Sequence, residues 1–319
     1  METTANNDSN TISNNKKQYY IGWLMAFIAV SLFSTKAVVV KLIYKFDDVD
    51  AVTTVALRMI LAFPIFAVSS YYTWKPLTKK QFGQVLLAGF LGYYLASFLD
   101  FICLQYISSS LERLILFLNP GVVLILSRII FKTTINKWQF ASLIMGYISI
   151  GIVFGHEQLG GSNIVLGVTL AFLSVISYAL YLILCSSVVK EMGAIRLTSL
   201  ATCVACFLCV GQLFIVKSDV ANYLSSMSWQ FYALSLVNAV FCTVIPVFLT
   251  MLAIERCGAS ITSQTGIIGP MITISLGVWL LDEKFTIYHT IGTIGVVLSM
   301  ILLTKGINQK LNKDISIKT

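Results

Sequence analysis

The chain has 319 residues, of which 57% are hydrophobic and only 11% are charged, and its mean hydropathy is +0.84. A soluble domain averages about 25% charged residues, so this composition excludes a protein whose surface faces water on all sides. The formal net charge of +8 would favour a nucleic-acid partner in a soluble protein, but here the basic residues lie mostly between long apolar stretches. We therefore predict an all-α integral membrane protein whose partner is the lipid bilayer, with no nucleic acid bound.

The chain begins with a polar segment, and long apolar stretches follow it. Residues 1–18 are rich in Asn, and we expect a disordered cytoplasmic tail. Crossing a hydrocarbon core about 30 Å thick takes about 20 residues in a helix. The stretches that reach or approach this length are residues 20–43, 52–72, 83–104, 109–131, 138–154, 164–188, 197–216, 230–253, 259–281 and 287–304. These are ten predicted transmembrane helices, and residues 306–319 form a second cytoplasmic tail.

The basic residues predict how these spans are oriented. If the N-terminus is cytoplasmic, most Lys and Arg residues lie at the inner side, and only Lys41, Lys45, Lys217 and Lys284 lie in outer connections. Membrane proteins retain an excess of Lys and Arg on the cytoplasmic side. We therefore predict a multi-pass membrane protein with both termini cytoplasmic.

The two halves of the chain share residues at a constant spacing. A shift of 150 places Ser110 and Pro120 of the fourth span on Ser260 and Pro270 of the ninth. Because each half contains five spans, the second half must enter the membrane from the opposite side. Inverted repeats of this kind are typical of alternating-access carriers. The predicted repeats are residues 19–154 and 164–305.

Several charged residues lie inside the spans at a similar depth, in the outer half of the bilayer. They are Lys36, Arg58, Asp100, Glu112 and Arg113. A charge in hydrocarbon costs roughly 2.5 kcal/mol or more, so these side chains should face protein or water and can meet one another. Two interpretations stay open: the cluster only holds helices together, or it binds the ends of a zwitterionic substrate or forms an outer gate. We assign Arg58 a structural role and place the other four on the substrate pathway.

Pro120 and Pro270 are predicted hinges, because proline removes a hydrogen bond of the helix and interrupted helices are typical of substrate sites near the midplane. A plain kink is the alternative interpretation. The other polar candidates for the pathway are Asn119, Tyr178, Tyr181 and Gln264.

The cysteines do not form a metal-binding pattern. Cys203, Cys206 and Cys209 recur every third residue, but within an apolar helix without His or carboxylate neighbours, where free Cys packs as a small hydrophobe. The spans also lack a nucleophile and base arranged for catalysis. We predict no metal, no cofactor and no catalytic residue, and hence a protein that is not an enzyme.

The stretch QYISSSLERLILFLNP, residues 105–120, together with the ten spans, the five-plus-five duplication and the prolines of spans four and nine, resembles the EamA-type carriers of the drug/metabolite transporter superfamily. The resemblance covers essentially the whole chain and implies the ten-helix carrier fold. Carriers of this type often have an acidic residue just after the fourth span of each half. Asp282 and Glu283 provide it in the second half, whereas Lys132, Thr133 and Thr134 occupy the first.

These features predict a secondary transporter. We expect it to move a small polar metabolite, an amino acid or related zwitterion, across the cytoplasmic membrane of a bacterium by alternating access, with export favoured. Uptake or exchange of a larger metabolite, such as a nucleotide-like or adenosyl compound, is the second hypothesis, and a non-transporting sensor or scaffold is the third. Proton coupling would involve Asp100 or Glu112. The expected partners are the small-molecule substrate and the bilayer, with room for a homodimer.

Overall fold

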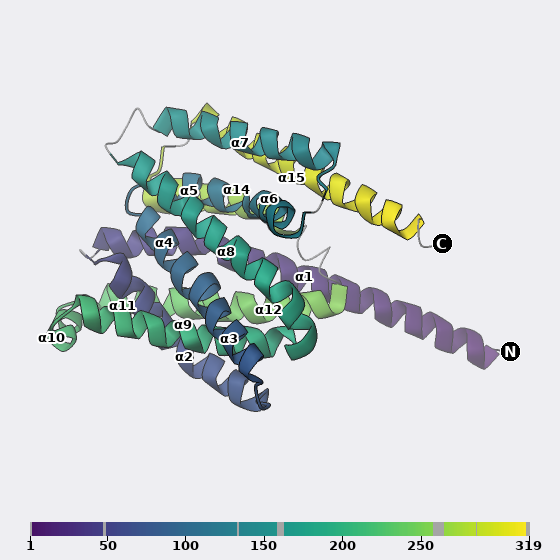
Figure 1. Ribbon diagram of the computed structural model, residues 1–319, viewed down its shortest axis with the longest axis horizontal. Coiled ribbons are helices and arrows are strands. Elements are labelled where there is room, and N and C mark those ends of the chain that lie inside the picture. The colour runs from purple at the N-terminus through teal and green to yellow at the C-terminus, as the bar shows by residue number, and fades with distance from the viewer. Residues whose placement is uncertain are drawn as a thin grey trace.

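The computed structural model is a bundle of α-helices that run lengthwise through the molecule (Figure 1). It describes residues 2–46, 49–132, 134–157, 163–257, 265–284 and 286–316. Within these residues there is no β-strand, and nine helical runs are long and apolar enough to cross a membrane. The prediction of an all-α protein is confirmed for this part of the chain.

The elements are named here in chain order. They are α1 (Glu2–Phe46), α2 (Ala51–Tyr72), α3 (Lys79–Ala88), η1 (Gly89–Leu95), α4 (Ala96–Cys103), α5 (Ser109–Leu116), α6 (Asn119–Phe131), α7 (Lys137–Glu157), α8 (Ile164–Met192), α9 (Ala194–Val216), α10 (Val220–Ser225), α11 (Trp229–Ala239), η2 (Val240–Val244), α12 (Ile245–Cys257), η3 (Gly266–Ile268), α14 (Gly269–Leu281) and α15 (Ile287–Ser316). The π-helices η1 and η2 each lie inside a longer run, α3 to α4 and α11 to α12.

The ninth predicted span, residues 259–281, is described only in its later part. The 3₁₀ turn η3 leads into α14, an apolar helix of 13 residues. By itself α14 is shorter than a full crossing requires. Gln264, a candidate for the pathway, lies outside the described residues.

The helix α1 is longer than the first predicted span. It begins at Glu2 and so includes residues 2–18, for which the sequence predicted a disordered tail. This segment contains neither Gly nor Pro, the two residues that interrupt a helix most strongly. The helix of the first span therefore continues through residues 2–18, and its apolar portion begins at Tyr20.

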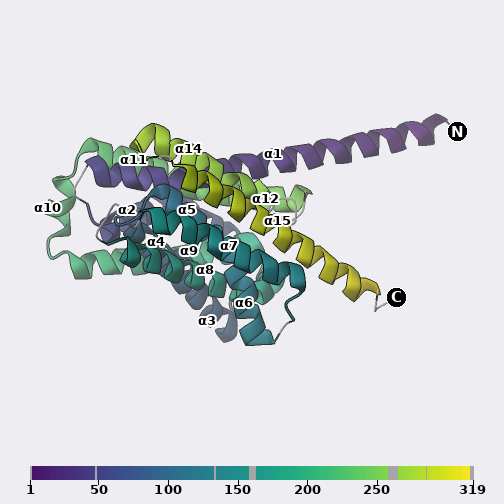
Figure 2. The same cartoon turned by 90° about the horizontal axis from the view of Figure 1, so that it is seen from above.

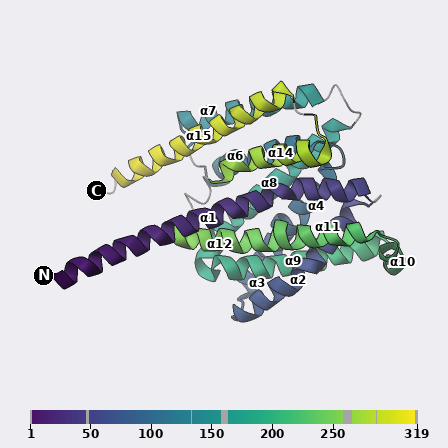
Figure 3. The same ribbon diagram turned by 180° about the vertical axis from the view of Figure 1, so that it is seen from behind.

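Both termini extend from the same end of the bundle, opposite α10 (Figure 2). Helices far apart in sequence lie side by side: α15 packs along α7, and α1 packs along α12 (Figure 3). At the end of the termini, Nη2 of Arg196 donates to the carbonyl of Lys75 at 2.5 Å, and Nδ2 of Asn136 donates to the carbonyl of Gly306 at 2.6 Å. We call the opposite end, at which Asp50 and Glu283 lie, the Glu283 end.

Asp50 begins α2 and also binds the end of α9. Its Oδ1 accepts a hydrogen bond from the backbone N of Thr53 at 2.9 Å, and Nζ of Lys217 lies 3.0 Å from its Oδ2. Burial alone would raise the pKa of Asp50, but the hydrogen bonds from Thr53 and the Lys217 ammonium outweigh burial and hold that pKa below its ordinary value. For Lys217, burial would lower the pKa, and Asp50 raises it by more. The pair therefore stays charged at neutral pH.

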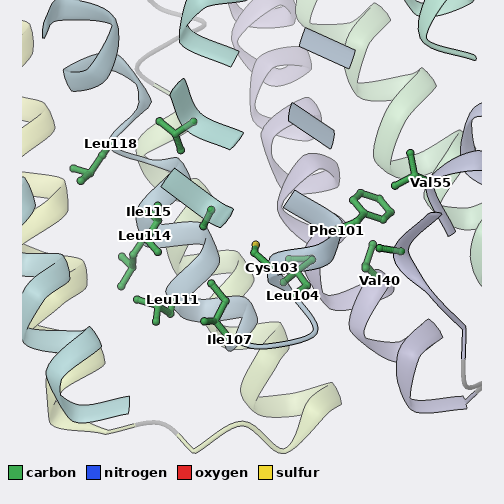
Figure 4. Packing of buried hydrophobic residues seen from close by; sticks show 14 of the residues in the cluster. Val40, Val55, Phe101, Cys103, Leu104, Ile107, Leu111, Leu114, Ile115 and Leu118 are labelled. Carbon is green, nitrogen blue, oxygen red and sulfur yellow. The ribbon is translucent and has the colours of Figure 1, made fainter. Parts of the chain in front are cut away.

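The largest core cluster surrounds α4 and α5 (Figure 4). Phe101, Leu111 and Leu114 are completely buried there, against residues of α1, α2, α7 and α8. In a bilayer such helices associate mainly through close packing, because lipid tails are as apolar as the side chains. This packing fixes the two helices that carry Asp100 and Glu112.

Irregular backbone recurs at a spacing of about 150 residues. The π-helix η1 in the third span matches η2 in the eighth. Lys132 after α6 and Asp282 after α14 both have left-handed backbone, with φ of 53° and 54°, and no other non-glycine residue of the described chain has a positive φ. Side chains with a Cβ adopt this conformation rarely. Such recurrence is expected of a duplicated structural unit.

Candidate functional site

Lys36, Asp100 and Glu112 meet inside the bundle. Nζ of Lys36 lies 2.5 Å from Oδ2 of Asp100 and 4.0 Å from Oε1 of Glu112. The three residues come from α1, α4 and α5, and the exposed fractions of Asp100 and Glu112 are 3% and 0%. The structure thus brings together three of the residues that the sequence placed at a common depth.

Hydrogen bonding in this cluster is incomplete. The carboxyl groups of Asp100 and Glu112 lie within hydrogen-bonding reach of each other, but Oδ1 of Asp100 and both oxygens of Glu112 receive no hydrogen bond from an N–H group of the residues that the structure describes. Buried polar groups are nearly always hydrogen-bonded, because an unpaired one costs free energy. Two carboxylates here share one ammonium group, so the cluster can accept N–H groups from a cationic ligand.

Arg58 belongs to the same region, although sequence reasoning gave it a structural role. Its guanidinium carbon lies 4.7 Å from the centre of the Phe101 ring, in the residue that follows Asp100. Arg58 is buried, and its Nε and Nη2 find no acceptor in the described part of the chain. Guanidinium groups bind carboxylates with two parallel hydrogen bonds. The sequence did indicate that Arg58 lies at the same depth in the membrane as the other four charged residues.

Arg113 points away from Glu112 and has other partners. Its Nη2 donates to the carbonyl of Phe33 at 2.6 Å, and its Nε donates to Oγ1 of Thr273 at 3.0 Å. Oγ1 of Thr273 in turn donates to the carbonyl of Ser34 at 2.8 Å. Consecutive residues of a helix do not share a face, so Glu112 and Arg113 reach different neighbours. Arg113 links α1, α5 and α14, and Thr273 is a partner that sequence reasoning did not find.

The two predicted hinge prolines each lie where a helical segment begins. α5 ends at Leu116 and α6 begins at Asn119, so Pro120 lies in the first turn of α6. Pro270 lies in the first turn of α14, directly after η3. Nδ2 of Asn119 donates to the carbonyl of Val175 in α8 at 3.3 Å. At Pro120 the α-helical pattern is broken only at Phe117 and Leu118, whose backbone stays right-handed, and at Pro270 a 3₁₀ turn precedes α14.

Tyr181 is packed against the π-helix η1. The hydroxyl of Tyr181 lies 3.1 Å from that of Tyr93, which the sequence did not single out, and the Tyr178 ring lies 5.4 Å from the Tyr181 ring. Oγ of Ser177 donates to the carbonyl of Leu91 at 2.7 Å, where the π-helix displaces the regular helical hydrogen bonds. Tyr178 is 40% exposed and Tyr181 only 7%, so Tyr178 has the more accessible side chain.

Gly92 in η1 allows Tyr181 to approach, which yields a test. A Cβ at Gly92 would lie 2.5 Å from the Tyr181 ring, whereas a Cβ at Gly83 in α3 would meet nothing within 4 Å. Gly92→Ala should therefore lower the free energy of unfolding by about 1–3 kcal/mol through overpacking. Gly83→Ala, the matched control, should be neutral or stabilising because Ala favours the helix. Thermal unfolding in detergent measures both, and equal effects would contradict this packing.

The described residues contain no group of three or more His, Cys, Asp or Glu side chains placed to hold a metal ion.

Comparison with known proteins identifies the family. The model of the EamA-like transporter family matches the chain twice, over residues 20–155 and 165–305. The chain belongs to the EamA-like transporter family. The resemblance inferred from the sequence is thus confirmed, and the protein is a multi-pass membrane protein of a transporter family.

Relatives are found in two bacteria. A protein of Bacillus subtilis (strain 168) named "Uncharacterized transporter YcbK" is 28% identical to this EamA-like protein over 293 residues, 86% of this chain and 90% of the relative. An "Uncharacterized protein" of Haemophilus influenzae is 30% identical over 113 residues, 35% of this chain and 87% of that protein. A crystal structure with 14% sequence identity superposes with a TM-score of 0.62 over 89% of this chain and 97% of the other. That likeness shows the fold alone.

Proposed function

We propose that this EamA-like protein is a secondary transporter that moves a small zwitterionic metabolite, such as an amino acid, across the cytoplasmic membrane of a bacterium. One observation carries the proposal: buried groups of both charges, on α2, α4 and α5, have unused hydrogen-bonding atoms. Oxygens of Asp100 and Glu112 can accept from an ammonium group, and Nε and Nη2 of Arg58 can donate to a carboxylate. A zwitterion carries one group for each set.

The energetics favour a ligand with both charges. A hydrogen bond to a charged group contributes roughly 1.5–3 kcal/mol, and a ligand that lacks one charge leaves buried protein groups unpaired. Each 1.4 kcal/mol is a factor of ten in affinity. The amine or the carboxylic acid that corresponds to the zwitterion should therefore bind roughly 10- to 100-fold more weakly.

The proposed mechanism is alternating access by two inverted five-helix repeats, residues 19–154 and 164–305. The double family match and the irregular backbone that recurs at a spacing of 150 residues support the repeats. The excess of Lys and Arg at the end of the termini supports a cytoplasmic position for both termini in the inner membrane. The Glu283 end then faces outward, and export is the expected direction.

A screen of metabolites with the purified protein tests this proposal. Amino acids, and the amine and acid that lack one of the two charged groups, are compared first by thermal stabilisation in detergent and then by counterflow in vesicles. Stabilisation and counterflow by an amino acid, but by neither partial analogue, are expected. A response to adenosyl or nucleotide-like compounds alone would replace the substrate class. No response to any metabolite, with stable association to another membrane protein, would favour a sensor or scaffold.

A further inference from the structure

Glu283 joins the two halves of the chain at the Glu283 end. Its Oε1 accepts a hydrogen bond from the backbone N of Ser109 at 2.8 Å, and its Oε2 accepts one from Oγ of Ser110 at 2.9 Å. Nζ of Lys41 lies 3.8 Å from Oε1. Glu283 follows α14 in the second half, whereas α5 and α1 belong to the first. One carboxylate therefore connects three helices.

The contact is stronger than a neutral hydrogen bond. Ser109 is the first residue of α5, and the first N–H groups of a helix have no partner within it and carry partial positive charge. A carboxylate that accepts from such a group forms a charge-assisted hydrogen bond, about twice as strong as a neutral one. The Lys41 ammonium adds attraction at the same carboxylate.

The local backbone directs Glu283 to this place. Asp282 ends α14 in a left-handed conformation, and the backbone N of Glu283 donates to the carbonyl of Gly277 at 3.2 Å. A Cβ at Gly277 would lie 2.7 Å from Oε2 of Glu283 and 2.8 Å from Oγ of Ser109. Only glycine leaves the space that the carboxylate and the start of α5 occupy together.

Glu283 lies between this end and the charged cluster along α5. Ser109, which it contacts, is completely buried, and Glu112 lies three residues further along α5. Residues three apart lie on neighbouring positions of one helix face. A solute that moves between the Glu283 end and Glu112 along α5 must therefore pass the place where Glu283 binds Ser109 and Ser110.

We propose that Glu283 is the latch of an outer gate: its hydrogen bonds to α5 hold the pathway closed and break each time the protein opens outward. The proposal rests on the alternating-access function proposed above. The first half has no matching acid, because Lys132 takes the place of Asp282 with the same left-handed backbone and residues 132–134 contain no carboxylate. In this structure the hydrogen bonds of Glu283 to α5 are formed, so the gate is closed.

Cysteine labelling from outside the cell tests the latch. Ser109→Cys is introduced after the native cysteines are replaced, because Oγ of Ser109 has no hydrogen-bond partner among the described residues and the backbone N that binds Glu283 is kept. A membrane-impermeant maleimide should label this cysteine slowly. Adding Glu283→Ala should raise the rate at least about tenfold, as expected for loss of a charge-assisted hydrogen bond. Glu283→Gln keeps a hydrogen-bond acceptor without the charge, so its labelling rate should lie between those of the protein with Glu283 and the Glu283→Ala variant.

Two further variants keep the test decisive. Asp282→Asn removes a charge from the same turn, but its side chain is 89% exposed and lies 4.0 Å from the exposed Lys45, so the labelling rate should not change. Lys41→Gln weakens the latch without touching Glu283 and should raise the rate roughly two- to fivefold. Lys41→Gln provides the test if the Glu283→Ala variant fails to fold.

The possible results separate the latch from the transport function. Equal labelling rates with and without Glu283→Ala, or fast labelling while Glu283 is present, would overturn the latch. Labelling requires no substrate, so rates that follow Glu283 in a protein that transports no metabolite would support the latch and reject the proposed transport. If the protein transports a metabolite but its labelling rate does not depend on Glu283, the result would support the proposed transport and reject the latch.

Discussion

Replacing Asp100 by Asn should destabilise the protein strongly, whereas replacing Lys36 by Met and Asp100 by Leu together should restore folding without restoring transport. Nζ of Lys36 lies 2.5 Å from Asp100, whose side chain is only 4% exposed. Removing one partner of a buried ion pair costs about 3–5 kcal/mol, while replacing both with apolar residues is often neutral or stabilising. Glu112 stays 4.0 Å from Nζ of Lys36, so the cost of Asp100→Asn should lie near the lower end of this range. Thermal unfolding and counterflow, measured on the same preparations, report the two effects separately.

The double replacement decides between the two interpretations of the charged cluster. If the pair only holds α1 against α4, transport should return together with folding. If it belongs to the substrate site, the double variant should insert and fold normally and remain inactive. Recovery of transport would therefore remove Lys36 and Asp100 from the pathway.

A second double variant is the matched control. Glu112→Gln with Arg113→Gln also removes one charge of each sign, but from residues that do not face each other. Arg113 donates to the carbonyl of Phe33 and to Thr273, so its loss leaves α1 and α14 without that link. This variant should therefore stay destabilised, whereas the Lys36→Met and Asp100→Leu double variant should recover its folding.

The positions of the spans and the depth of the charges could be predicted from the sequence because hydrocarbon constrains both. The second predicted span, residues 52–72, and the observed helix, Ala51–Tyr72, differ by one residue at one end. The common depth of Lys36, Asp100 and Glu112 likewise follows from counting residues along helices. The prolines also predicted irregular helix near Pro120 and Pro270, and the α-helical pattern is broken just before both residues.

The partners of these charges could not be predicted, because they depend on how each helix is rotated about its axis. Arg113 and Glu112 are adjacent in sequence but contact different helices. Arg58 was assigned a structural role, and its neighbour Phe101 and its unpartnered Nε and Nη2 are visible only in the structure. Hydropathy gives the depth of a residue but not the direction of its side chain.

The π-helices could not be predicted from the sequence either. A local pattern does not distinguish η1 from the α-helix around it, and its support comes from another helix. Oγ of Ser174 and Oγ of Ser177, both in α8, donate to the carbonyls of Ala96 and Leu91. These bonds join residues 78 and 86 positions apart, so they become visible only once the helices are packed.

Replacing Glu112 by Gln should have opposite effects on stability and on substrate binding. Glu112 is completely buried, its carboxyl group lies beside that of Asp100 and receives no N–H hydrogen bond from the described residues, and Nζ of Lys36 lies 4.0 Å away and closer to Asp100. An unsatisfied buried group costs about 1–3 kcal/mol, and more when it is charged. Removing the charge should therefore stabilise the empty protein by roughly that amount.

The same change should weaken substrate affinity roughly 10- to 100-fold, because the ammonium of the substrate loses a charged acceptor. Thermal unfolding without ligand and binding calorimetry with the best metabolite of the screen measure the two quantities. Asp100→Asn provides the contrast, since it weakens binding and folding together. A Glu112→Gln protein that is less stable and binds as before would make Glu112 a structural residue. A buried charge that lowers stability without a compensating partner is retained where function requires it, so the opposite signs of the two effects would mark Glu112 as part of the substrate site.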